Sequence, residues 1–121
     1  MFEGTLIAES LRPGTTLDAV PLTVRTITRA VPGTTTSDQP PTWTLISFEI
    51  TDADADPLAN ALAASLAEPG WYTDFRSLTQ TYVVFPARVF RYPRGDEAGR
   101  SQAVAYGRTL AIPESQLDWP V

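Results

Sequence analysis

The segment that sets the pattern of this fold is residues 42–70, TWTLISFEITDADADPLANALAASLAEPG. Its first part alternates in character, because Ile46, Phe48 and Ile50 fall on one side of an extended chain. The opposite side carries Trp43, Leu45 and Ser47. This alternation is typical of a β-strand that places one face in a core. We therefore predict a strand over residues 42–50.

A helix is expected to follow this strand directly. Asp56 is well placed as its N-cap and Pro57 as its first residue, and the acidic residues ahead of them suit the positive end of a helix dipole. The Pro69-Gly70 pair should end the helix. An apolar stripe suited to packing on a sheet is formed by Leu58, Leu62 and Leu66.

Strand-like segments lie on both sides of this central stretch. They are residues 5–11 and 21–31 before it and residues 70–76, 80–86 and 87–93 after it. A second helix is expected over residues 96–111, because Ala103, Tyr106 and Leu110 fall on one helical face. Two other segments should lie outside these elements. Residues 32–41, PGTTTSDQPP, should form a polar loop. In residues 113–121, Leu117 and Trp119 should pack the C-terminal segment against the rest of the domain.

Strands in runs with helices between them predict the α+β fold class. The 121 residues suit a single domain over residues 1–121. We expect a mostly antiparallel sheet of about six strands in two βββα-like halves. The first three strands would form a meander, and both helices would pack on one face of the sheet.

The chemistry available to this chain is restricted, because it contains no cysteine, histidine or lysine and all nine basic residues are arginines. Catalytic triads that use an imidazole base, Schiff-base lysines, phosphate loops with a Gly-Lys pair and zinc sites are therefore excluded. Only carboxylate, hydroxyl, phenol and guanidinium groups remain. We expect a protein that is not an enzyme, with no catalytic residues, no cofactor and no metal site.

The balance of charge argues against a nucleic-acid partner, because the formal net charge is -5. The charge is unevenly distributed, since residues 88–108 hold five arginines against Asp96 and Glu97. This basic region could face an anionic partner or the acidic part of a second copy.

The segment GWYTDFR, residues 70–76, contains the first set of candidate binding residues. Strand alternation sends Tyr72, Asp74 and Arg76 to one face, about 7 Å apart. Trp71 and Phe75 should belong to the core under the first helix. The simpler interpretation makes the polar trio a solvated outer face with cross-strand partners. The alternative is a small recognition surface.

The second set of candidate binding residues comes from RVFRYPRGD, residues 88–96. Here Arg91 and Arg94 lie among aromatic residues, an arrangement that can bind anions or stack on flat ligands. Ordinary surface ion pairs are the competing interpretation. The ligand-binding candidates are thus Tyr72, Asp74, Arg76, Arg91 and Arg94.

The expected location is cytoplasmic. No stretch approaches the roughly 20 apolar residues that a membrane span needs. The first ten residues, MFEGTLIAES, show no basic region followed by an apolar run and hence no signal peptide.

The C-terminal half resembles a known group of sequences. The segments GWYTDF, YVVFPARVFRYPRGD and AVAYGRTLAIPESQLDW are similar to those of a family of small uncharacterised bacterial proteins that share this order. The resemblance implies a bacterial, cytoplasmic protein and assigns no catalytic residues.

Three functional hypotheses follow from these observations. The first, which the sequence favours, is a non-enzymatic interaction module that forms a homodimer or binds a protein partner, through a sheet edge or through the second helix at Gly107. The second is a domain that binds a small anionic or flat ligand. The third is a carboxylate enzyme with Asp74 or Glu49 as acid or base and Tyr72 assisting, which requires a partly buried carboxylate with a raised pKa beside a cleft.

Overall fold

The computed structural model describes residues 1–18 and 20–121. Within them, six strands form one sheet in the order β2-β3-β1-β4-β5-β6, and every neighbouring pair is antiparallel. The strands are β1 (Phe2–Ile7), β2 (Thr23–Ala30), β3 (Trp43–Ile50), β4 (Thr73–Arg76), β5 (Gln80–Phe85) and β6 (Arg88–Pro93). The helices are α1 (Asp52–Ser65) and α2 (Glu97–Thr109), with short 3-10 turns at Ala8–Ser10 and Glu114–Gln116. The expected α+β class with an antiparallel sheet is confirmed.

The expectation of a meander in the first half is wrong. β1 does not pair with β2; it lies between β3 and β4 at the centre of the sheet. The physical reason is burial, because β1 places Phe2 and Leu6 in the core, whereas every side chain of β2 from Thr23 to Arg29 is exposed. A strand with no buried face belongs at an edge. Residues 8–22 are long enough to carry the chain past β3.

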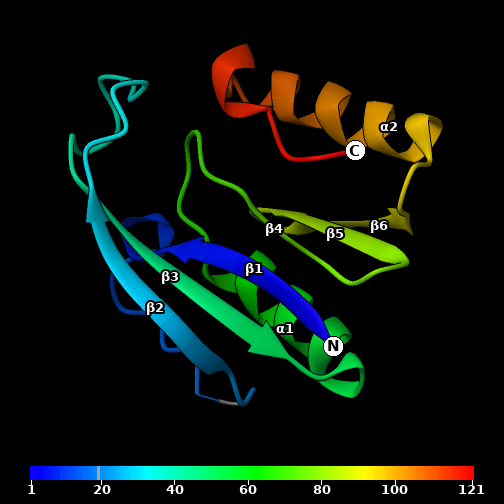
Figure 1. Ribbon diagram of the computed structural model, residues 1–121. Coiled ribbons are helices and arrows are strands. Elements are labelled where there is room, and N and C mark those ends of the chain that lie inside the picture. Colours follow the sequence, from blue (N-terminus) through cyan, green and yellow to red (C-terminus); the bar gives the residue numbers. More distant parts are fainter. Residues whose placement is uncertain (19) are drawn as a thin grey trace.

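The two helices lie on opposite faces of the sheet, which corrects the expectation that both pack on one face (Figure 1). β5 shows the cause, because Tyr82 and Val84 belong to the core cluster with α1, while Val83 and Phe85 belong to the cluster with α2. A continuous apolar strand needs cover on both of its sides. α2 supplies the second cover for the β4-β5-β6 half.

The first helix begins earlier than expected. Its N-cap is Thr51, whose hydroxyl donates to Asp54, and Pro57 lies inside the helix. The missing amide of Pro57 would have bonded the carbonyl of Ala53, an exposed residue in the first turn, so the cost of the proline is small there. Asp56 instead accepts a hydrogen bond from the Tyr82 hydroxyl and joins α1 to β5.

The second helix and the C-terminal segment largely follow the sequence. Asp96 is the N-cap of α2 and accepts a hydrogen bond from the Gly99 amide, and both Leu117 and Trp119 are buried as expected. Gly107, however, does not offer a surface to a partner. A Cβ there would lie 2.7 Å from Leu117 Cδ2, so this glycine lets the chain's own C-terminal segment approach α2.

One part of the sheet remains open. On the face that α2 covers, the helix and the C-terminal segment lie over β4, β5 and β6, while no helix of the described residues covers β1, β2 and β3 on that side (Figure 1). Because these three strands lack a helix there, the open part of the sheet is the feature from which a site can be built.

Among the described residues, no helix is long and apolar enough to cross a membrane.

Candidate functional site

A groove runs over the open face of the sheet, bordered on one side by Pro120 of the C-terminal segment. Its volume is about 440 Å³, within the range of small-molecule sites. Strand alternation determines its chemistry, because the residues of β1, β3 and β4 that point away from α1 are mostly polar or charged. The residues that define this sheet-face groove are Glu3, Thr5, Ser47, Glu49, Asp74, Arg76 and Pro120.

The polar trio of the fourth strand segment does share one face, as alternation predicts, but that face is not a solvated one. Tyr72, Asp74 and Arg76 are all half-buried, because α2 and the C-terminal segment approach β4 on this side. The expectation of a solvated outer face is therefore wrong. Phe75 lies in the core with α1 as expected, whereas Trp71 packs on Trp43, with 5.3 Å between ring centroids.

Tyr72 has a structural role in this arrangement. Its hydroxyl donates a hydrogen bond to the backbone carbonyl of Gln116, and its ring packs against Phe85 and Trp119. Burial raises the pKa of the Tyr72 phenol, and the negative charge of Asp74 adds to that effect. The phenol is thus occupied and neutral, and it is not free to assist an acid or base.

Asp74 is the most perturbed carboxylate of the groove. Burial raises its pKa from 3.8 to about 6, and nearby Asp118 acts in the same direction. Arg76 opposes this effect but does not cancel it. Asp74 accepts no side-chain hydrogen bond from the described residues. A partly buried carboxylate with a raised pKa beside a cleft is a common mark of a functional site.

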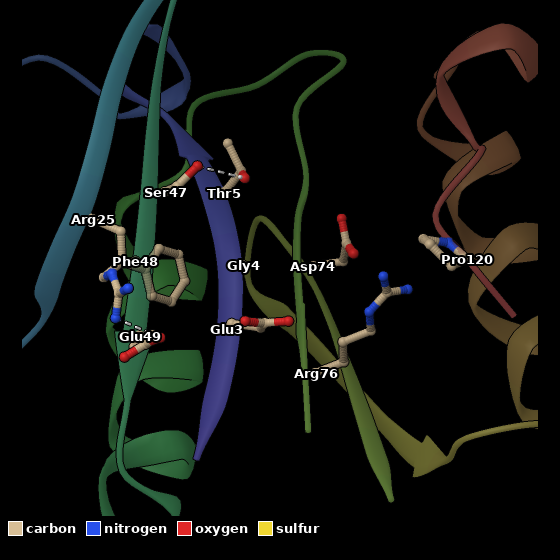
Figure 2. A pocket seen from close by; sticks show the side chains of 10 residues that line it. All are labelled: Glu3, Gly4, Thr5, Arg25, Ser47, Phe48, Glu49, Asp74, Arg76 and Pro120. Atoms are coloured by element: carbon tan, nitrogen blue, oxygen red, sulfur yellow. Dashed lines mark hydrogen bonds and ion pairs between the residues drawn. The ribbon is translucent and has the colours of Figure 1, made fainter. Parts of the chain in front are cut away.

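Arg76 lies two residues further along the same strand. Its Nη1 is buried and has no hydrogen-bond partner among the described residues. Glu3 on β1 is its cross-strand neighbour, yet no ion pair joins them within the described part of the chain. Figure 2 shows Asp74 and Arg76 projecting from β4 into the space between that strand and Pro120, with Glu3 alongside. Charges of both signs thus face the groove without a side-chain hydrogen bond or ion pair within the described part of the chain.

The polar side chains on the opposite rim of the groove bond to one another. Arg25 donates to Glu49 at 2.9 Å, and the Thr5 and Ser47 hydroxyls lie 3.3 Å apart, within hydrogen-bonding distance (Figure 2). Glu49 is therefore ion-paired, which argues against it as a free acid or base. The unpaired chemistry of the groove is concentrated on β4 and on Glu3.

The remaining candidates from the sequence lie elsewhere. Arg91 belongs to the opposite face, where its Nη1 lies 3.4 Å from Asp56 Oδ1 and its guanidinium stacks over the Tyr82 ring at 5.1 Å. Arg94 donates to the Ser77 carbonyl and lines a small pocket beside the end of the groove, together with Arg76 and Glu3. The five candidates therefore do not converge, and Asp74 and Arg76 are the pair that shares the groove.

Sequence reasoning missed Glu3, the third charged member of the unpaired set. No signal along the chain links it to Arg76, because the two residues meet only through the pairing of β1 with β4.

Among the described residues, no group of three or more carboxylates is placed to hold a metal ion. No family model, curated protein or solved structure matches this chain.

Proposed function

We propose that this chain is a small-molecule-binding domain, whose sheet-face groove holds a dipolar group of its ligand. The observation that carries the proposal is the set of unpaired charges at Asp74, Arg76 and Glu3, all facing one groove. Asp74 and Arg76 are half-buried, whereas Glu3 is exposed, and half-buried charges without partners lower stability unless something compensates them. A ligand that brings the complementary charges would supply that compensation.

The arrangement of the charges indicates which kind of ligand group fits. Arg76 offers a planar fork of donors suited to a carboxylate or another oxyanion. Asp74 and Glu3 offer acceptors suited to an ammonium or amide group. Because Asp74 and Arg76 are two strand residues apart, about 7 Å along β4, the two charges of the ligand should be separated by a similar distance.

A simple dipeptide tests this proposal. Glycylglycine carries an ammonium and a carboxylate at its two ends, succinate carries two carboxylates and putrescine carries two ammonium groups. We expect glycylglycine to cause saturable changes in the NMR amide shifts of β1 and β4, and the other two probes to bind more weakly. No saturable change with the dipolar probe, or equal changes with all three, would overturn the proposal.

Matched variants locate the binding. Arg76→Gln and Asp74→Asn should each abolish or strongly weaken the effect of glycylglycine. Arg91→Gln is the control for Arg76→Gln, because Arg91 lies on the opposite face and its loss removes the same positive charge from the chain. Equal weakening in Arg91→Gln would show that the groove is not the site.

Self-association is a second candidate function, favoured by the exposure of Val24 and Ile27 on the edge strand β2, at 50% and 66%. The same edge also carries Arg25, Arg29 and a register irregularity between Val24 and Thr26, which are features that protect edges from pairing. The geometry therefore supports the groove more strongly. Ile27→Lys tests the edge, since it should shift any dimer towards monomer in sedimentation velocity.

The bacterial origin and cytoplasmic location expected from the sequence remain predictions.

A further inference from the structure

The groove continues into a second pocket of different character. This pocket, of about 340 Å³, lies at the end of the open face where β1 and β3 meet the loop of residues 32–41. Its apolar and aromatic lining comes from Ile7, Ala30, Trp43, Leu45, Trp71 and Tyr72. We refer to these six residues as the aromatic pocket.

Side-chain hydrogen bonds fix the segments that surround the aromatic pocket. The side-chain amides of Gln39 and Gln116 bond each other in both directions, at 3.2 and 2.9 Å. Gln39 also donates to the Gly70 carbonyl, and Gln116 donates to the Thr34 carbonyl at 2.7 Å. These bonds hold the loop of residues 32–41 against the C-terminal segment, so the loop forms a wall at one end of the face.

The back of the pocket is aromatic. Trp43 and Trp71 are both buried and pack at a tilt of 60°, and Trp43 is fixed by its indole N–H, which donates to the Pro40 carbonyl. Leu45 and Ile7 are only half-buried on the sheet floor, so apolar surface remains uncovered there. Aromatic walls over an apolar floor favour a flat ring, which can pack edge-on or offset against them.

The aromatic pocket and the sheet-face groove are adjoining parts of one surface. Thr5 and Asp74 line both of them, so a single molecule can reach from one to the other. Asp74 lies at the junction, and Arg76 lies beyond it on the groove side. Asp118 also lines the aromatic pocket, so the order along the face is the aromatic pocket with Asp118, then Asp74 at the junction, then the guanidinium of Arg76.

We infer that the ligand is an aromatic dipolar molecule in which the ring adjoins the ammonium group and the carboxylate lies at the far end. The ring occupies the aromatic pocket, the ammonium group meets Asp74 and the carboxylate meets Arg76. A dipeptide that begins with an aromatic residue has this order of groups, whereas a free amino acid carries its ammonium and carboxylate on one carbon. The inference rests on the proposed function, because the dipolar end uses the same groove.

Two isomeric dipeptides test the order of groups directly. Phenylalanylglycine has its ring beside the ammonium, and glycylphenylalanine has its ring beside the carboxylate. Burying the ring should make phenylalanylglycine bind at least about tenfold more tightly than glycylglycine in calorimetric titrations. Glycylphenylalanine should gain much less. Free phenylalanine should bind more weakly than phenylalanylglycine, because its ammonium and carboxylate share one carbon and cannot reach Asp74 and Arg76 together; equal binding would overturn the assigned positions of the two charges.

Variants of the pocket provide the second arm of the test. Ala30→Leu extends an apolar side chain towards the pocket from the end of the edge strand, where a change is readily accommodated, and Leu45→Phe fills it from the floor. Each should remove the gain from the phenyl ring and leave glycylglycine binding intact. Val24→Leu is the control, because Val24 is an exposed residue of the same strand whose cross-strand partner, Phe48, lies in the core with α1.

The outcomes separate this inference from the proposed function. If glycylglycine binds and phenylalanylglycine binds no better, the aromatic pocket is not used and the inference fails while the proposed function stands. If the two isomers bind equally, the assigned order of groups is wrong. If neither glycylglycine nor phenylalanylglycine binds, both the inference and the proposed function fail.

Discussion

Replacing Asp74 with asparagine should stabilise the protein at neutral pH. Burial raises the pKa of Asp74 from 3.8 to about 6, so ionising this carboxyl costs more in the folded chain than in the unfolded chain. The difference corresponds to about 3 kcal/mol, or about 2 kcal/mol after allowance for solvent screening at a half-buried site. Asparagine has nearly the same shape and cannot ionise, so it avoids this cost.

The sign of the pH dependence follows from proton binding. Between pH 3.8 and about 6 the folded protein holds a proton on Asp74 that the unfolded chain has released, so stability falls as the pH rises through this window. The free energy of unfolding of Asp74→Asn minus that of the wild type should therefore increase by about 2 kcal/mol from pH 4 to pH 7 and then level off.

Urea denaturation across this pH range measures the difference directly. Asp38→Asn is the matched control, because Asp38 is an exposed carboxylate in the loop of residues 32–41 and its replacement removes the same charge. The stability of that variant should run parallel to the wild type. A difference for Asp74→Asn that stays constant with pH, or that decreases as the pH rises, would refute the assignment of a buried, proton-retaining carboxyl at this position.

The core and the sheet offer further predictions. Leu62→Ala should lower the free energy of unfolding by about 2–5 kcal/mol in urea denaturation, because Leu62 is fully buried in α1; a loss below about 1 kcal/mol would contradict that burial. Gly4→Ala should cost about 1–3 kcal/mol, because its Cβ would lie 2.6 Å from Phe75 Cβ and the strands cannot separate without losing pairing; an unchanged melting temperature would refute this. Tyr92→Phe should lower the free energy of unfolding by about 1 kcal/mol in urea denaturation, because it keeps the ring and removes only the hydroxyl that accepts the 2.7 Å hydrogen bond from the Trp119 indole N–H; an unchanged stability would contradict a contribution from that bond.

Most local elements were predictable from the sequence, because their causes are local, but β1 runs over Phe2–Ile7 instead of residues 5–11 and α1 ends at Ser65, before the Pro69-Gly70 pair. Alternation located β3 at Trp43–Ile50, and β5 and β6 start and end within a residue of the expected segments. Asp96 could be identified as the N-cap of α2 because capping depends on the residues within one turn. The start of α1 was misplaced for the opposite reason. A proline marks the first turn of a helix only by preference, and the chain accepts it later where the lost hydrogen bond is exposed to water.

The candidate site could be predicted only in part. Alternation along one strand correctly placed Tyr72, Asp74 and Arg76 on one face, because that relation needs no knowledge of other strands. Their surroundings could not be inferred in this way. Tyr72 has a structural role because its hydroxyl donates to the Gln116 carbonyl, and Arg91 lies on the opposite face of the sheet.

The sequence by itself determined the class of the fold and the available chemistry. The absence of histidine, cysteine and lysine left carboxylates and guanidinium groups as the charged side chains, and the run of strands and helices led to an antiparallel α+β sheet. Only the tertiary structure decided which of those groups meet. It placed β1 beside β4, so that Glu3 faces Arg76, and it placed α2 over half of one face, so that the other half remains an open groove. The physical reason is that hydrogen bonds between strands join residues far apart in sequence, and the burial of the whole chain selects that pairing.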